Sequence, residues 1–199
     1  MGAITTQMIK ELRERTNAGM MDCKKALQEC GGDMDKAVDW LRQKGLAVAA
    51  KRAGRATSEG TVQCYLHAGN KIGVLVEVDC ETDFVAKNEQ FVQFAKDLAL
   101  HICAANPVAL RREDVPPELV EREKEIYRQQ AIESGKPENI VEKIIEGRLD
   151  KFFKEVCLLE QPYVKDPDIT IQDKLNELIA KMGENITIKR YARFQVGTD

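Results

Sequence analysis

The sequence is poor in the residues that build most catalytic and metal sites. Its only histidines, His67 and His101, are too few and too isolated for a recognisable metal cluster or catalytic triad. Its six cysteines are scattered, and no two have the spacing of zinc ribbons or thioredoxin-like redox sites. We therefore expect no metal and no cofactor, and we interpret the cysteines as reduced, partly buried small hydrophobic residues.

The sequence also lacks an excess of positive charge. Lys and Arg total 30 against 33 for Asp and Glu, which leaves a net charge of −3. This balance gives no general attraction to nucleic acid or to an anionic membrane. The basic residues Lys51, Arg52 and Arg55 cluster without interleaved aromatic residues, a pattern more typical of a solvated face than of a phosphate-binding one. The expected partner is therefore a protein or a small molecule.

Long apolar runs are missing as well, so no segment is expected to span a membrane. The amino terminus has no basic region followed by an apolar core, and a cytoplasmic location is therefore the default expectation. With 199 residues and 43% hydrophobic content, the chain can still bury a substantial core. Its length suits one domain with a small accessory domain.

Residues 1–45 show the periodicity of three short helices that bury one face each. Thr5 or Thr6 is expected to cap the first, Gly31–Gly32 separates the second from the third, and Gly45 is expected to end the third. The expected apolar stripes are Met8, Ile9 and Leu12; then Met21, Ala26 and Leu27; then Ala37, Val38 and Leu41. For the pair Met20–Met21 we expect one side chain in the core and leave the other open.

Residues 46–60 are small and basic and are predicted to form a linker, helical at first, before an α+β core at residues 61–199. Alternating apolar residues over 72–78 predict a central strand, and Gly69–Asn70 predicts a hairpin turn before it. A third strand is expected over 186–196, with Ile186, Ile188 and Ala192 on one face. The predicted sheet is thus three-stranded.

Helices are expected to cover this sheet. Phe91, Phe94, Ala95, Leu98, Ala99 and Ile102 recur at helical spacing after an Asn88 cap. Two later helices joined by Ser134–Lys136 are predicted to form an antiparallel helical hairpin. The last helix is expected to end at Gly183.

The connector after the central strand, Glu81-Thr82-Asp83-Phe84-Val85, permits two interpretations. In the first, Phe84 folds under the next helix and Asp83 caps backbone amides. In the second, Phe84 is an exposed aromatic residue beside an acid on a rigid mount, which suits a wedge inserted into a partner. Physical arguments alone favour the first interpretation.

Two segments, Leu12–Leu27 and Cys80–Ala86, closely resemble bacterial translation elongation factor Ts. The resemblance includes Gly135–Pro137, Glu146–Arg148 and Arg193–Gly197, so it extends over essentially the whole chain. Longer members carry a second core segment, whereas this chain has one Thr-Asp-Phe-Val and resembles the short form. For residues 1–45 the resemblance implies a three-helix bundle of the ubiquitin-associated type.

The resemblance also implies a function, and it reverses the preference stated above for Phe84. A member of this family exchanges guanine nucleotide on elongation factor Tu, in its GDP-bound or nucleotide-free form, and is not an enzyme. Thr82, Asp83, Phe84 and Val85 match the segment that dislodges the magnesium ion bound with GDP. Arg13, Met20 and Met21 match bundle positions that dock on the same partner domain. Short members are implied to act as homodimers, with no direct contact to nucleic acid or membrane.

Two other classes of function are alternatives to nucleotide exchange. The first is a binding module in which the bundle captures a peptide or helix, the core is a scaffold, and GDP release is unchanged. The second is an enzyme that uses Asp83 with His67 or Glu81 as acid and base. No nucleophile, metal cluster or phosphate loop accompanies those residues in the sequence, so this last class has little support.

Overall fold

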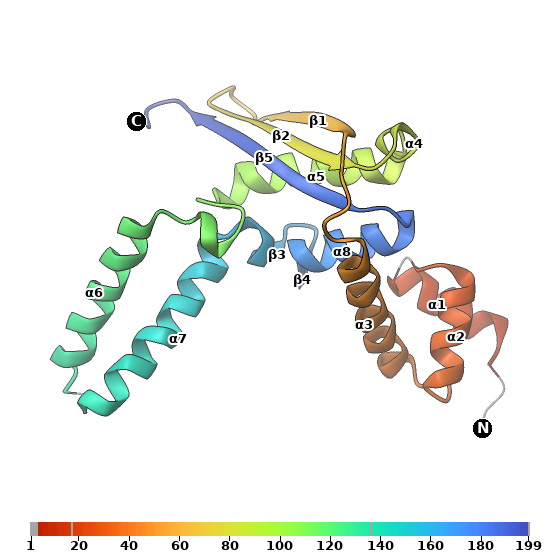
Figure 1. The fold of residues 1–199 in the computed structure, drawn as a ribbon, viewed down its shortest axis with the longest axis horizontal. Coiled ribbons are helices and arrows are strands. Elements are labelled where there is room, and N and C mark those ends of the chain that lie inside the picture. Colours follow the sequence, from red (N-terminus) through yellow and green to blue (C-terminus); the bar gives the residue numbers. More distant parts are fainter. Residues whose placement is uncertain (1–3, 17, 136, 199) are drawn as a thin grey trace. The chain divides into compact units, whose positions relative to one another are not determined.

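The structure, a computed structural model, describes residues 4–16, 18–135 and 137–198 (Figure 1). The elements in chain order are α1 (Thr6–Thr16), α2 (Met20–Glu29), α3 (Met34–Arg52), β1 (Glu59–Leu66), β2 (Ile72–Cys80), α4 (Asp83–Ala86), α5 (Glu89–Ala105), η1 (Arg112–Asp114), α6 (Pro117–Glu133), α7 (Glu138–Val156), η2 (Leu158–Glu160), β3 (Pro162–Tyr163), β4 (Asp166–Thr170), α8 (Ile171–Met182) and β5 (Ile186–Gln195). This mixture of helices with small sheets confirms the predicted α+β class.

The chain forms two compact units. The first comprises Met1–Thr61, Val78–Gln93 and Asp173–Lys189. The second comprises Val62–Glu77, Phe94–Gln172 and Arg190–Asp199. Strands β1, β2 and β5 and helix α5 each contribute residues to both units.

The predicted three-helix bundle is present at the amino-terminal end of the first unit. Its fully buried core consists of Leu12, Cys23, Ala26, Leu27 and Ala37. Partly buried residues pack around this core, among them Met8, Ile9, Val38 and Leu41. The expected stripes are therefore confirmed, except for Met21, which is 75% exposed.

The prediction that Gly45 ends the third helix is wrong. Helix α3 continues through Gly45 to Arg52, so residues 46–52 of the expected linker are helical. Gly45 is buried, and a Cβ added there would lie 4.0 Å from the Cβ of Ala180 in α8. Glycine ends helices where it adopts a positive φ, whereas here tertiary packing keeps it inside the helix. The predicted domain boundaries at 45 and 60 themselves stay a prediction.

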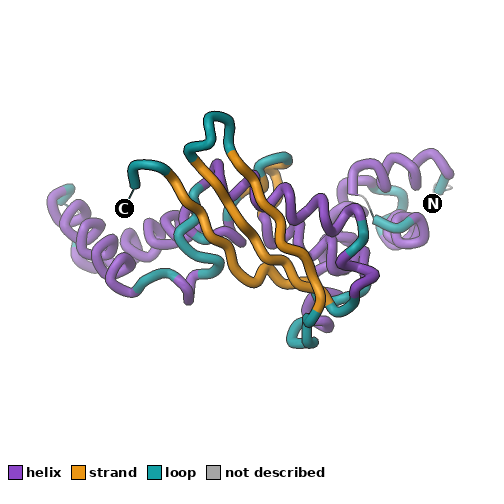
Figure 2. Tube along the Cα trace, turned by 90° about the horizontal axis from the view of Figure 1, so that it is seen from above, coloured by secondary structure: helices purple, strands orange, loops and turns teal. Residues whose placement is uncertain are grey.

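The main sheet has the order β1-β2-β5, as Figure 2 shows from above. Gly69 and Asn70 both have positive φ, which confirms the predicted turn between β1 and β2. The Val196 amide donates to the Lys71 carbonyl oxygen (2.9 Å), which places the end of β5 beside the start of β2. Strand β5 therefore runs antiparallel to β2. The alternating residues Val74, Val76 and Val78 are buried, as expected.

The predicted alternation in β5 fails halfway along the strand. Ile186 and Ile188 are buried, but Lys189 and Arg190 are both exposed, and the inward positions after them are odd-numbered. Ala192 is consequently exposed rather than buried. Tyr191 instead points inward, where its hydroxyl donates to the Pro107 carbonyl oxygen (2.7 Å). A shift of one residue moves every later side chain to the other face.

Helices α6 and α7 form the predicted antiparallel hairpin of the second unit (Figure 1). Ala131, Val141, Ile145 and Leu149 are buried between them. Gly135 has a φ of 68°, which reverses the chain after α6. Lys136, the last residue of the expected link, lies outside the described residues.

A second sheet, formed by β3 and β4, was not predicted. The two strands pair antiparallel, and they are too short to show periodicity in the sequence. The Tyr163 hydroxyl donates to the buried Asp97 carboxylate of α5 (2.7 Å), and the Lys165 ammonium lies 2.6 Å from the same side chain. This contact with α5 fixes the small sheet, because a buried carboxylate requires its partners.

The remaining expectations about chain chemistry concern cysteines and membranes. All six cysteines are free, and Cys23, Cys80, Cys103 and Cys157 are buried, as expected for reduced hydrophobic residues. Within the described ranges, no helix is both long and apolar enough to cross a bilayer.

His101 of α5 is buried and holds one specific protonation state. The Gln161 amide nitrogen donates to the Glu155 carbonyl oxygen (2.6 Å), so its oxygen accepts from His101 Nε2 (2.9 Å). In the neutral ring the proton is therefore on Nε2, and Nδ1 carries none and has no hydrogen-bond partner. Desolvation lowers the pKa of His101, and the hydrogen bond to Gln161 only partly opposes this.

We expect His101 to make stability fall as the pH drops from 7.5 to 5.5. Because its folded pKa lies below its unfolded value, the unfolded chain binds the proton more strongly, and stability is lost as pH falls through the unfolded pKa. Urea unfolding at the two pH values checks this. The stability loss should be smaller in His101→Gln, and an equal loss in both proteins would contradict the assignment.

Candidate functional site

Phe84 lies on α4, a single helical turn that follows β2 in the first unit. Its side chain is 83% exposed, whereas the next residue, Val85, is 9% exposed. Adjacent residues of a helix point in different directions, so the turn that buries Val85 directs Phe84 outward. The interpretation that Phe84 folds under the following helix is therefore wrong. The aromatic ring is a free apolar surface on a short, anchored element.

Asp83 stands beside this ring at the start of α4. Its carboxylate accepts from the Lys87 ammonium (2.7 Å), one helical turn further on. This hydrogen bond, together with weaker interactions with the first amides of α4, holds the pKa of Asp83 below its ordinary value. Asp83 is thus an ionised surface group, which does not suit general acid–base chemistry at neutral pH.

The turn is anchored at both ends. At its carboxyl end, the Asn88 amide donates to the Val85 carbonyl oxygen (2.9 Å). The Asn88 Oδ1 also accepts from the Gln90 amide (2.9 Å), which confirms the predicted cap of α5. At the other end, the amide and the hydroxyl of Thr82 both donate to the Glu184 carboxylate, at 3.0 and 2.7 Å. Glu184 lies far from Thr82 in the sequence, and no motif connects them, so analysis of the sequence missed this residue.

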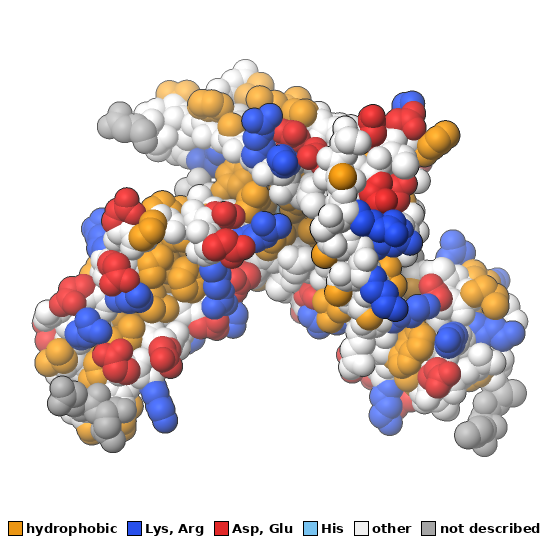
Figure 3. Space-filling model, viewed as in Figure 1, with side chains coloured by type: hydrophobic (Ala, Val, Ile, Leu, Met, Phe, Trp, Pro, Cys, Tyr) orange, Lys and Arg blue, Asp and Glu red, His pale blue; other side chains and the backbone are white. Residues whose placement is uncertain are grey.

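The three bundle positions expected to dock on a partner are all exposed. Arg13 lies on the outer side of α1. Met20 and Met21 begin α2 and are 42% and 75% exposed, so the expectation that one of them fills the core is wrong. Cys23, Ala26 and Leu27 occupy the inward positions of α2 instead. Figure 3 shows hydrophobic side chains among charged ones over α1 and α2.

The residues considered for acid–base catalysis have other partners. His67 Nδ1 lies 3.4 Å from the Tyr65 hydroxyl, at the exposed hairpin. Glu81 accepts from the Asn185 amide (2.6 Å) and from Arg55 (3.2 Å), and the first of these contacts is the main cause of its lowered pKa. In the part of the chain that the structure describes, no three His, Cys, Asp or Glu side chains are grouped to hold a metal ion.

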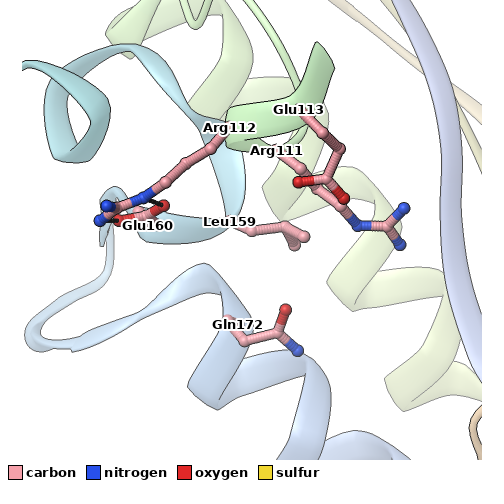
Figure 4. A pocket seen from close by; sticks show the side chains of 6 residues that line it. All are labelled: Arg111, Arg112, Glu113, Leu159, Glu160 and Gln172. Atoms are coloured by element: carbon pink, nitrogen blue, oxygen red, sulfur yellow. Dashed lines mark hydrogen bonds and ion pairs between the residues drawn. The ribbon is translucent and has the colours of Figure 1, made fainter. Parts of the chain in front are cut away.

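A shallow pocket in the second unit contains none of the expected site residues (Figure 4). It is lined by Arg111, Arg112, Glu113, Leu159, Glu160 and Gln172. The Arg112 guanidinium pairs with Glu160 and with Asp150 (2.8 Å), and it lies 5.0 Å from the centre of the Phe153 ring. These contacts explain Arg112 as a structural residue that ties η1 to η2 and α7.

The comparison with known families decides which kind of protein presents this surface. The sequence matches the family described as Elongation factor TS over residues 6–198. The chain belongs to the elongation factor Ts family. The resemblance seen in Leu12–Leu27 and Cys80–Ala86 is therefore confirmed.

Relatives in the elongation factor Ts family align with the chain almost from end to end. Elongation factor Ts of Desulfotalea psychrophila is 70% identical over 195 residues, which cover 98% of this chain and 99% of the relative. The protein of the same name from Carboxydothermus hydrogenoformans is 64% identical over 194 residues, covering 98% and 89%. That of Nitratidesulfovibrio vulgaris is 64% identical over 197 residues, covering 99% and 98%.

Proposed function

We propose that this chain is a guanine-nucleotide exchange factor for elongation factor Tu. The observation that carries the proposal is the exposed Phe84 ring on the anchored turn α4, in a member of a family that acts as the exchange factor of elongation factor Tu. The chain binds the GDP complex, disturbs the magnesium and phosphate site, promotes GDP release and holds the nucleotide-free partner until GTP binds.

The thermodynamic basis of exchange is reciprocal coupling. If the chain binds nucleotide-free partner more tightly than GDP-bound partner, it must weaken GDP binding by the same factor. Magnesium requires near-ideal octahedral oxygen ligands at roughly 2.0–2.1 Å, so a small displacement of the partner's loops costs much of its affinity. Exchange of this kind needs no covalent step and no catalytic residue in the chain.

We assign different roles to the two sets of exposed residues. Thr82, Asp83, Phe84 and Val85 form the segment that dislodges magnesium, with Phe84 as the apolar wedge. Arg13, Met20 and Met21 dock the bundle on the partner's nucleotide domain. Exposed methionines suit such docking because their unbranched, polarizable side chains adapt to a partner surface. Both sets belong to the same compact unit.

We also propose that the chain forms a homodimer, and an exposed apolar face of the second unit supports this proposal. Its part of the sheet presents an outer face that consists of Val62, Cys64, Leu66, Leu75, Ala192, Phe194 and Val196, all exposed. Figure 3 shows hydrophobic side chains gathered over the strands in this region. The Glu77–Arg190 pair (2.5 Å) neutralises the charges at one end of the face. A second copy offers the same apolar, neutral surface, and two such sheets stack at a spacing of about 10 Å.

The release of a fluorescent GDP analogue from elongation factor Tu tests the proposed exchange function. Catalytic amounts of the chain should accelerate release well beyond the rate of the partner alone. Binding without acceleration would instead establish the simpler docking module, in which the bundle captures its partner and the core is a scaffold. That outcome would remove the role assigned to Phe84.

A further inference from the structure

Glu184 makes a two-point contact with the segment that precedes Phe84. Its Oε2 accepts from the Thr82 amide (3.0 Å), and its Oε1 accepts from the Thr82 hydroxyl (2.7 Å). Both oxygens of one carboxylate are thus engaged by the same residue. A bidentate contact of this kind fixes orientation as well as distance, and hydrogen bonds to an ionised acceptor are stronger than neutral ones.

Thr82 is the N-cap residue that immediately precedes α4. Its backbone is extended, with φ −129° and ψ 156°, and its side chain caps none of the α4 amides. Threonine in this position ordinarily directs its hydroxyl oxygen at the helix amides. Here the hydroxyl donates to Glu184 instead, so the contact replaces the local cap. The start of α4 is therefore held from outside by the segment that follows α8.

Neighbouring contacts hold both sides of this contact in place. The Cys80 thiol donates to the Thr82 carbonyl oxygen (3.2 Å), and burial raises the pKa of Cys80 to about 11, so the thiol keeps its proton. On the other side, the amide of Asn185 donates to Glu81 (2.6 Å), while its side chain donates to the Arg55 carbonyl oxygen (2.8 Å). Glu184 lies between the end of α8 and the start of β5. The contacts of Asn185 hold the backbone next to Glu184, and the contact of Cys80 holds the backbone of Thr82.

We propose that Glu184 is a positioning residue that sets the direction of Phe84 by holding Thr82 at the start of α4. The inference rests on the proposed exchange function, since it concerns the orientation of the Phe84 side chain toward the partner. Phe84 is two residues from Thr82, and its ring is 83% exposed, so packing within the chain contributes little to its orientation. The backbone of α4 therefore sets the direction of the ring. Glu184 holds one end of this turn through Thr82, and the Asn88 amide holds the other end by donating to the Val85 carbonyl oxygen (2.9 Å).

Exchange kinetics with Glu184→Gln test this role. Glutamine keeps the size of the side chain but offers one acceptor and an amide group that cannot accept from the second Thr82 donor. We expect the kcat of exchange to fall about tenfold, as for the loss of one hydrogen bond to a charged group. The KM for GDP-bound partner should stay within about twofold, because the docking residues Arg13, Met20 and Met21 are untouched.

The matched control is Glu177→Gln. It also replaces one glutamate by glutamine, but at a position within α8. Glu177 pairs with Lys174 (2.9 Å) on its own helix rather than with the connector. Its kinetics should equal those of the unchanged protein. An equal fall in kcat for both variants would show a general effect of charge and would overturn the proposal.

A second measurement keeps the inference separate from the exchange function. Hydrogen exchange of the Thr82 amide, followed by nuclear magnetic resonance, should be at least about tenfold faster in Glu184→Gln than in the unchanged protein or in Glu177→Gln. Unchanged protection would overturn the positioning role even if exchange activity fell. The two proposals can also fail separately. If the unchanged protein does not accelerate GDP release, but the Thr82 amide exchanges faster in Glu184→Gln, the proposed exchange function is wrong and the Glu184–Thr82 contact is confirmed.

A double variant tests whether Glu184 acts through Thr82. Thr82→Val removes the hydroxyl that Glu184 accepts from and leaves the backbone amide. Combining it with Glu184→Gln should reduce kcat by clearly less than the product of the two single effects, because both act on one contact. Fully multiplicative losses would show that Glu184 acts by another route.

Discussion

Replacing Phe84 by alanine is expected to slow nucleotide exchange on elongation factor Tu roughly tenfold to hundredfold and to leave the stability of the free chain nearly unchanged. Burying a Phe side chain is worth about 1.5–3 kcal/mol, and about 1.4 kcal/mol corresponds to a factor of ten in rate. The ring is 83% exposed in the free chain, so that energy is gained only when the partner covers it. Stopped-flow release of a fluorescent GDP analogue measures the rate, and thermal unfolding measures the stability.

Phe84→Ala and Met20→Ala should impair different steps of exchange. Loss of the wedge should lower the exchange rate at saturating partner, whereas loss of a docking methionine should mainly weaken binding of the partner. Val164→Ala is a suitable control, because Val164 is 43% exposed but belongs to neither set. Equal losses of rate and binding in both variants would contradict this division of labour. A marked loss of stability in Phe84→Ala would contradict its exposure.

Replacing Phe194 by aspartate is expected to dissociate the proposed homodimer, with an affinity between protomers at least about a thousandfold lower. Phe194 lies on the outer sheet face and is 71% exposed in the isolated chain. In a symmetric dimer the substitution places one carboxylate from each copy into the same apolar interface. Burying an unpaired charge costs several kcal/mol, and about 1.4 kcal/mol is a factor of ten in affinity. Sedimentation velocity over a range of concentrations measures the change.

The matched control for this experiment is Val108→Asp. Val108 is also apolar and 48% exposed, but it follows α5, and its backbone amide donates to the Val156 carbonyl oxygen (2.9 Å), so it does not belong to the outer sheet face. It should leave the dimer intact. A chain that is monomeric without any substitution would refute the homodimer, and a dimer that survives Phe194→Asp would move the interface to another surface.

Much of the fold was predictable because local sequence patterns indicate its helices, strands and turns. The repeat of apolar residues along α1, α5 and β2 matches the period of each element, and a period depends on neighbours in the sequence alone. Gly69–Asn70 indicated its turn for the same reason, since tolerance of positive φ depends on the residue type. The α6–α7 hairpin followed from two amphipathic helices with a short link.

Three of the failed fold predictions share one cause, which is contact between residues distant in the sequence. Gly45 stays helical because it packs against Ala180, and the phase of β5 shifts because Tyr191 reaches Pro107. The small sheet β3–β4 depends on Asp97, which lies more than sixty residues earlier in the chain. Local propensity and periodicity contain no information on such partners.

For the candidate site, sequence motifs alone were enough to predict the family and the segment that carries the site. The motifs around Leu12–Leu27 and Thr82–Val85 pointed to elongation factor Ts, and the family comparison confirmed it. The way in which that segment is exposed depends on the packing of the folded chain. This packing turned Phe84 outward because Val85 takes the buried position, and it brought Glu184 to Thr82 across about a hundred residues of chain. Exposure and long-range contact are properties of the packed chain, because they depend on which other residues fill the space around a side chain.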